Sequence, residues 1–375
     1  MFSSKVKPNR EPLIHITKRD DIGFLKSALI HLLGLIFALL LCSSLIVALT
    51  GKSPIELFRS MYEGVIGTPI ANAGINKKYV ESIHYAAILL CIALAITPAF
   101  KMKFWNIGAE GQVLAGCLTS AYCMLEYGDK LEAYALIPLM LILSMLAGAL
   151  WAIIPAVCKA IWNTNETLFT LMMNYVAMTL VSYFIMIKDK SGRSDLGYIN
   201  ERTGFGYLPE LFERKYIFDI LIVSAVTIFM FIYLKFSKQG YEISVVGESE
   251  NTARYIGINV KKVIIRTAAI SGAICGLVGF MILSGYKHSI SPNIAEGQGF
   301  TAIMVSWMGK FNPFIMVLVS FLITFLGVGG KYATNELKID NSIGDILAAI
   351  VIFCIIACEF FIHYKVNFHA FKRRK

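Results

Sequence analysis

Long apolar runs separated by short polar segments recur along the whole chain. Most of these runs hold about 20 residues, which is the length that an α-helix needs to cross the roughly 30 Å hydrocarbon core of a membrane. The run 300–308 is too short to cross as a straight helix, so we expect it to be broken or half-length. About ten spans are predicted, at residues 28–50, 83–100, from within 106–112 to about 125, 134–157, from within 163–175 to about 187, 217–236, 263–286, 300–308, 312–328 and 343–364. The predicted fold class is therefore an all-α membrane protein of about ten transmembrane helices, some of them broken or half helices.

The polar segments set the expected organisation of the chain. Residues 1–27 are predicted to be a cytoplasmic N-terminal segment, 28–364 a transmembrane domain, and 365–375 a basic cytoplasmic tail. We expect no cleavable signal peptide, because the apolar run after the basic leader is too long for one. Three longer polar stretches connect spans, at 51–80, 188–216 and 237–262.

The distribution of positive charge orients these loops. An even number of spans puts both termini on one side, and the majority of the 35 Lys and Arg residues fall on that side. Basic residues gather in cytoplasmic loops, so both termini and the loop 237–262 are predicted to be cytoplasmic. The loops 51–80 and 188–216 are then predicted to face outward.

Composition supports a membrane protein. It argues against a nucleic-acid-binding protein and against a fold held by disulfides or a metal. Hydrophobic residues make up 57% of the 375 residues and charged residues 16%, whereas soluble domains carry about 25% charged residues. The net charge of +10 follows from the cytoplasmic bias of basic loops and does not indicate a nucleic-acid-binding surface. Eight cysteines lie in or near apolar runs without a CxxC pair, so we expect core packing, no metal site and no disulfide framework.

A polar segment interrupts the apolar pattern at residues 106–112. Its sequence, Asn-Ile-Gly-Ala-Glu-Gly-Gln, places the ionisable Glu110 at the edge or the inside of the membrane. Such groups are costly there and usually face a cavity, a partner or a pathway. The two glycines permit irregular backbone, which is tolerated at that depth only where protein or water covers it. We predict an interrupted helix at this point.

Part of this segment recurs later in the chain. Residues 109–112 read Ala-Glu-Gly-Gln, and residues 295–298 read the same. The two copies lie five predicted spans apart and open their spans from opposite sides. This pattern is typical of a five-plus-five inverted repeat whose broken helices meet near the midplane. Chance recurrence of four letters is the other explanation, and both stay open.

Three motifs carry a resemblance to a known family. The sequence Phe-Trp-Asn-Ile-Gly-Ala-Glu-Gly-Gln at 104–112 resembles the signature segment of bacterial ABC-importer permeases of the ribose/nucleoside type, a branched-chain-type family of inner-membrane permeases. The segment 247–258 is similar to the cytoplasmic coupling helix of that family, with Thr252 and Ile256 where small alanines are usual. The residues Asn-Glu, Thr-Leu-Met and Asn-Tyr within 165–175 match a third motif. The resemblance covers about residues 80–365.

The resemblance implies roles for two sets of residues. The residues expected to couple to an ATPase are Glu248, Ser249, Asn251, Ala253, Arg254 and Gly257. The residues expected to line the substrate pathway are Trp105, Asn106, Glu110, Gln112, Asn174, Phe300 and Trp307.

Five of the seven pathway assignments have a structural alternative. Glu110 would otherwise cap its own broken helix, and Asn174 would act as a hydrogen bond between helices. The three aromatic residues would otherwise be anchors at the membrane interface.

The chain lacks the means to hydrolyse ATP. A P-loop requires Gly-x4-Gly-Lys-Ser/Thr, and the nearest match, at 51–53, has Ile46 where the first glycine must stand. We therefore expect no catalytic residue, no metal and no cofactor on this chain, with ATP and Mg on a partner ATPase.

The predicted function is the permease subunit of an ABC importer in the bacterial inner membrane. Nucleosides are the first predicted cargo, and ribose or a similar simple sugar is the second. The expected partners are an ATP-binding subunit, a second permease and a substrate-binding lipoprotein or periplasmic protein. The chain resembles the larger subunit of a heterodimeric permease pair.

An ion-coupled secondary transporter with broken helices is the alternative. The motif similar to a coupling helix argues against it, because a secondary carrier needs no docking helix. A membrane-embedded transferase is a third class, and the sequence offers no catalytic cluster for it.

Overall fold

The computed structural model describes residues 14–18, 24–51, 53–67, 77–190, 192–210 and 216–368. Most of these residues are helical, and the predicted all-α membrane fold is confirmed. Eight helices in the described ranges are long and apolar enough to cross a membrane. Helix α4 (Ala109–Tyr127), of 19 residues, and helix α11 (Gln298–Met308), of 11, complete the predicted series of about ten. The chain forms two compact units, 1–64 with 326–375 and 65–325.

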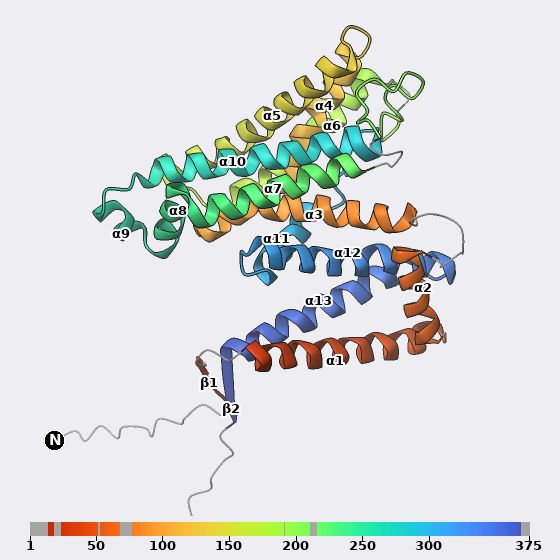
Figure 1. Ribbon diagram of the computed structural model, residues 1–375, viewed down its shortest axis with the longest axis vertical. Helices are drawn as coiled ribbons and strands as arrows, with labels where there is room; N and C mark the ends of the chain where they lie inside the picture. Colours follow the sequence, from red (N-terminus) through yellow and green to blue (C-terminus); the bar gives the residue numbers. More distant parts are fainter. Residues whose placement is uncertain are drawn as a thin grey trace, which may run out of the picture. The chain divides into compact units, whose positions relative to one another are not determined.

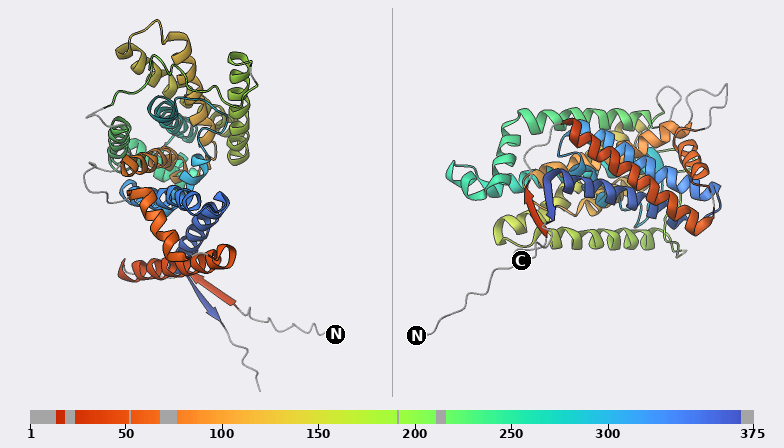
Figure 2. Two further views of the ribbon diagram at one scale, coloured as in Figure 1. Left: turned by 90° about the vertical axis from the view of Figure 1, so that its right-hand side faces the viewer. Right: turned by 90° about the horizontal axis from the view of Figure 1, so that it is seen from below.

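The first unit joins the two ends of the chain. Helix α1 (Phe24–Thr50) packs against α13 (Asn341–His363), and Gly34 lets the Cys358 side chain approach its backbone closely. Beyond these helices, strand β1 (Ile14–Lys18) pairs antiparallel with β2 (Tyr364–Phe368), Ile14 opposite Phe368 (Figure 2). This pairing places residues 14–18 beside 364–368, which is consistent with an even number of spans between them.

The second unit holds the helices with the most buried residues. Its elements are α3 (Lys77–Lys101), α4, α5 (Ala133–Trp162), α6 (Glu166–Lys188), α7 (Ile217–Phe236), α8 (Lys238–Glu248), α9 (Glu250–Tyr255), α10 (Val260–Met281), the π-helical turn η1 (Ile282–Lys287) and α11 (Figure 1). Helices α3 and α10 are the best buried of the candidate spans. They form the centre around which α4, α5, α7 and α11 pack. Two further helices, α2 (Pro54–Ile66) and α12 (Pro313–Glu336), run across the boundary between the units.

Small residues bring α5 and α10 into backbone contact. Gly272 and Gly276 lie one turn apart on α10 and face Ser144 and Gly148 of α5. A Cβ atom at Gly276 would clash with the backbone of Ser144. Close backbone approach through small residues is the main packing device between helices in a membrane, because lipid is as apolar as the side chains. The apolar pattern of the sequence gives no signal of the close contact at Gly272 and Gly276.

Several boundaries differ from the prediction. Helix α3 begins at Lys77, inside the predicted outer loop 51–80, which also contains the whole of α2. The polar loop 237–262 is mostly helical, because Ser237, Ser249 and Asn259 cap α8, α9 and α10 with their side chains. The strand pairing was also missed, since five-residue polar strands next to long apolar helices give little periodic signal.

We predict that a single added methyl group disrupts the packing of α5 on α10. Gly276→Ala places a Cβ against the Ser144 backbone, and overpacking of this kind costs about 1–3 kcal/mol. The measurement is the free energy of unfolding in mixed detergent micelles. Gly327→Ala is the matched control, since no atom within 4 Å of that helical glycine would meet the new Cβ. Equal stability of the two variants would contradict this packing.

Candidate functional site

Two interrupted helices meet inside the second unit. The segment 102–108 leaves the end of α3 and turns into α4, while 288–297 leaves η1 and turns into α11. Glu110, in the first turn of α4, is 1% exposed. Its Oε1 accepts a hydrogen bond from Gly297 N at 2.9 Å, and its Oε2 accepts one from Gly299 N at 2.8 Å.

This contact explains why a carboxylate is retained in an apolar setting. The first backbone N–H groups of a helix have no partner within it, and the helix dipole favours negative charge at that end. Glu110 therefore caps α11, the partner helix. The alternative in which it caps its own helix is wrong, because both of its oxygens accept from the start of α11, and α4, whose N-cap is Gly108, has no side-chain cap. A Cβ at Gly299 would lie 2.6 Å from Glu110 N, so only glycine allows this approach.

The two copies of the repeated four residues are thus in direct contact. The glutamate of the first copy binds the backbone around the second. In addition, α4 packs on α10 while α11 packs on α3. An inverted repeat that relates α3 to α10 and α4 to α11 requires both contacts. The structure supports this relation for these four helices, and the full five-plus-five repeat stays a prediction.

Amides secure the irregular segment before α4. Gln112 Nε2 donates to Asn106 Oδ1 at 3.1 Å, and Asn106 Nδ2 donates to Ser271 Oγ of α10 at 3.3 Å. From α6, Asn174 Nδ2 donates to Ile107 O at 3.0 Å, while its Oδ1 accepts from Gly111 N at 2.8 Å. Asn106, Gln112 and Asn174 are each at most 2% exposed. They act here as links between helices, and a place on the substrate pathway stays a prediction for them.

The aromatic candidates are exposed. The Trp105 and Trp307 rings stack with centroids 5.4 Å apart and planes at 26°, and they are 43% and 50% exposed. Phe300, two turns before Trp307, is 42% exposed on the same face of α11. The half helix α11 therefore presents an apolar, aromatic face that no described residue covers fully.

A buried contact between a histidine and an aspartate lies at the opposite end of α3. His84 Nε2 lies 2.9 Å from Asp219 Oδ2 of α7, and both side chains are 1% exposed. Tyr216 stacks on the imidazole with centroids 4.5 Å apart. His84 Nδ1 and Asp219 Oδ1 have no hydrogen-bond partner among the described residues. The sequence placed His84 at the entrance of its span, but Asp219, 135 residues away, gave no signal of the pairing.

The expected coupling residues lie on α8, α9 and the turn after them. Ser249 caps α9 by accepting a hydrogen bond from Thr252 N at 3.3 Å, as the capping pattern predicts. Gly257 ends the segment with φ of +85°, a conformation that favours glycine. Arg254 pairs with Glu250 at 3.2 Å, and Ala253 of α9 is fully buried. Glu248 and Asn251 are exposed.

The structure adds two residues to this set. Tyr255 is 92% exposed and Ile256 is 50% exposed, and α9 projects beyond the ends of α7 and α10 (Figure 1). Large apolar side chains on a projecting polar segment mark an interaction site. In the sequence, Ile256 stands out only as a departure from the family pattern. Nothing in the sequence indicated that Tyr255 is exposed.

Helix α8 connects this projection to the interrupted helices. Gly247 lies so close to the carbonyl of Lys101 that a Cβ would clash with it. Lys101 ends α3, and Trp105 and Asn106 follow within five residues. Helix α8 therefore touches the end of α3 from which the segment 102–108 leads to Glu110.

These features define a multi-spanning helical membrane protein. Its short helices α8 and α9 form a projecting segment, and two broken helices meet in its interior. The family model for the permease component of branched-chain amino acid transport systems matches residues 79–356, and the chain belongs to this family. It is a multi-pass transport subunit, and ATP hydrolysis is supplied by a separate protein.

Several curated relatives align along most of the chain. A glucose ABC transporter permease protein of Haloferax volcanii, TsgB13, is 28% identical over 86% of this chain and 85% of its own. A guanosine ABC transporter permease protein of Bacillus subtilis, NupP, is 29% identical over 86% and 92%. A nucleoside ABC transporter permease protein of Lactococcus lactis, NupB, is 25% identical over 90% and 92%. A second guanosine permease protein of Bacillus subtilis, NupQ, is 30% identical over 62% and 75%.

We predict that the carboxylate of Glu110 is essential to the junction of α4 and α11. Glu110→Gln keeps the size but replaces one acceptor with an amide N–H₂ group, which faces a backbone donor. Loss of a charged hydrogen bond costs about 1.5–3 kcal/mol, and an unsatisfied donor adds to this. The free energy of unfolding in detergent micelles measures the loss.

Glu126→Gln is the matched control for this prediction. Glu126 is on the same helix and pairs with Lys188 at an exposed site, so we expect its change to leave the free energy of unfolding nearly unchanged. A Glu110→Gln variant as stable as this control would show that the capping contact contributes nothing.

Proposed function

We propose that this chain is one permease half of an ABC importer that carries nucleosides across the bacterial cytoplasmic membrane by alternating access. The observation that carries the proposal is the exposed aromatic face of α11 together with Trp105, at the end of the unit from which α9 projects. Aromatic rings stack on nucleobases with about 1–3 kcal/mol per base. The names of NupP and NupB support nucleosides, and the name of TsgB13 supports a simple sugar as the second candidate.

The proposed assembly has two permease halves, an ATPase that binds ATP and Mg, and a substrate-binding lipoprotein or periplasmic protein. The exposed aromatic face of α11 is where a second permease subunit would pack, which is an argument for a dimer. A heterodimer is favoured because two different guanosine permeases occur in Bacillus subtilis, and the alignment with NupP spans far more of this chain than that with NupQ. The outer segments 51–67 and 192–210 would receive the binding protein.

In the proposed cycle, the ATPase binds around α9 and moves it when ATP is bound and hydrolysed. The close contact of Gly247 with Lys101 would transmit the movement to the segment 102–108. That segment and the α4–α11 junction would then shift relative to α10, which the small-residue contact with α5 holds in place. No residue of this chain takes part in a covalent step.

We predict that Tyr255 anchors the ATPase. Tyr255→Ala removes the most exposed aromatic side chain of the projecting segment, and loss of an anchor of this kind weakens binding about tenfold or more. The measurement is the amount of ATPase that co-purifies with the tagged chain in mild detergent.

Tyr134→Ala is the control, because Tyr134 is 79% exposed at the start of α5, at the other end of the unit. Full retention of the ATPase by Tyr255→Ala would exclude α9 as the docking site. Substrate-dependent uptake on an ion gradient without any ATPase would overturn the importer itself.

We predict that the reconstituted transporter takes up guanosine in preference to glucose or ribose, in an ATP-dependent manner. Trp307→Ala removes half of the stacked pair and should raise the apparent KM for the nucleoside roughly tenfold. Trp307→Phe should restore most of the affinity. Uptake of labelled cargo into proteoliposomes measures both.

Trp162→Ala is the control, since Trp162 is 68% exposed at the end of α5. Preferential uptake of a sugar, with KM unchanged in Trp307→Ala, would replace nucleosides by sugars as the cargo and remove the stacking role.

A further inference from the structure

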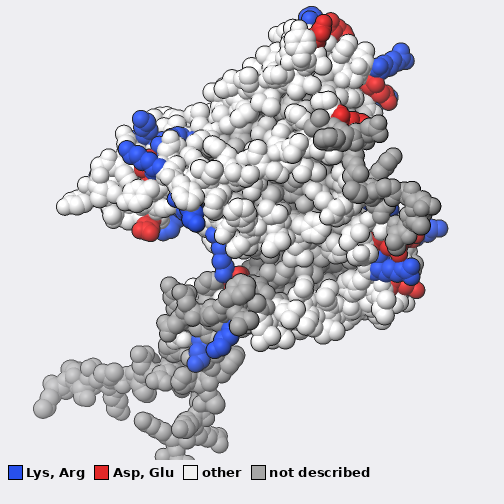
Figure 3. Space-filling view, in the orientation of Figure 1, with Lys and Arg blue, Asp and Glu red and all other residues white. Residues whose placement is uncertain are grey.

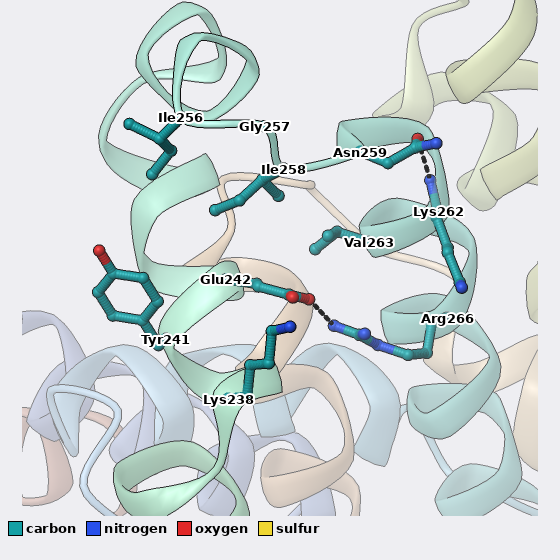
Figure 4. A pocket seen from close by; sticks show the side chains of 10 residues that line it. All are labelled: Lys238, Tyr241, Glu242, Ile256, Gly257, Ile258, Asn259, Lys262, Val263 and Arg266. Carbon is teal, nitrogen blue, oxygen red and sulfur yellow. Dashed lines mark hydrogen bonds and ion pairs between the residues drawn. The ribbon is translucent and has the colours of Figure 1, made fainter.

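A pocket of about 470 Å³ lies between α8, the turn at 256–259 and the first two turns of α10 (Figure 4). Lys238, Tyr241 and Glu242 contribute from α8, and Lys262 and Arg266 contribute from α10. The pocket thus joins the ends of two spans, because α7 ends at Phe236 and α10 begins at Val260. Figure 3 shows that Lys and Arg side chains gather over this end, while the adjoining surface of the long helices is largely free of charge.

The charges in this pocket do not balance within the described residues. Arg266 Nη2 donates to Glu242 Oε2 at 2.9 Å, which uses the pocket's one carboxylate. Lys238 and Lys262 line opposite walls, and both are exposed. Neither has an ion pair among the residues that the structure describes. Arg266 Nε is buried and has no hydrogen-bond partner in the same part of the chain. The pocket therefore offers two exposed cations, Lys238 and Lys262, to an anion with several acceptor oxygens.

The pocket also lies at the level of a membrane interface. Phe236 and Tyr241 flank Lys238 and are 69% and 61% exposed. Aromatic and basic side chains at one level are typical of the cytoplasmic boundary of a membrane. Below them, Phe229 and Ile232 continue an exposed apolar stripe along α7. The stripe leads along α7 to Phe236, two residues before Lys238 of the pocket.

We propose that this pocket binds the phosphate head group of an anionic phospholipid, with the acyl chains along α7. Basic pockets between membrane helices on the cytoplasmic side are suited to such head groups. The aromatic level and the apolar stripe favour a lipid over an acidic side chain of the ATPase, which would approach from the aqueous side. A bound lipid would bridge α8 and α10, and would thereby steady the base from which α9 projects. The inference holds whatever the cargo is.

The experiment is native mass spectrometry of the full chain in detergent micelles. Phosphatidylglycerol and phosphatidylcholine with the same acyl chains are titrated in turn. The double variant Lys238→Gln/Lys262→Gln should bind the first phosphatidylglycerol about tenfold more weakly, because each lysine near an anionic head group contributes severalfold to binding. Its binding of phosphatidylcholine should not change.

Lys103→Gln/Lys261→Gln is the matched control. It removes the same charge from exposed positions that do not line the pocket, and Lys261 adjoins Lys262. Tenfold weakening confined to the pocket variant supports the proposal. Equal weakening in both variants means general surface attraction and overturns it. Unchanged phosphatidylglycerol binding together with loss of the co-purified ATPase makes the pocket part of the ATPase interface, and also overturns it.

Discussion

The contact between the Glu110 carboxylate and the backbone of Gly297 and Gly299 is the constraint on which the interior of this protein depends. A half-length helix inside a membrane exposes N–H groups that lipid cannot satisfy, and each would cost several kcal/mol. One carboxylate satisfies two of them and complements the helix dipole. In return, the α11 N-terminus gives the buried charge its partners. The broken helices therefore stabilise each other: α4 supplies the acceptor for the N–H groups of α11, and α11 supplies the donors for the carboxylate of α4.

The parts around this junction differ in how much they can move. On one side, α10 is held against α5 by contact between backbones at Gly272 and Gly276, which leaves little room for sliding. On the other side, the segment 102–108 is irregular and is held by side-chain amides, and α8 touches its base at Gly247. Hydrogen bonds between side chains can be exchanged one at a time, whereas interlocked backbones cannot. A transporter that moves its broken helices relative to a fixed frame would need this division.

Sequence reasoning found the junction but not its geometry. Glu110 stood out because a carboxylate in an apolar run is costly, and the repeated Ala-Glu-Gly-Gln indicated a second broken helix. The exchange of a cap between the two copies could not be predicted, because hydrogen bonds between residues 187 positions apart leave no periodic trace. The same holds for His84 with Asp219 and for the strand pairing of the two chain ends. Asn174 was weighed between two roles, and its two hydrogen bonds show the structural one.

The sequence by itself determined the number and order of the spans, the interruptions at 106–112 and before 300, and the Ser249 cap of α9. These follow from local quantities: the length of an apolar run, the cost of a charge, and the preference of Ser and Asn for a helix start. The tertiary structure alone decided which broken helix Glu110 caps, which glycines bring backbones together, and that Tyr255 projects while Ala253 is buried. These depend on which faces of distant helices meet, and in a uniformly apolar chain the pattern of hydrophobicity no longer distinguishes one face from another.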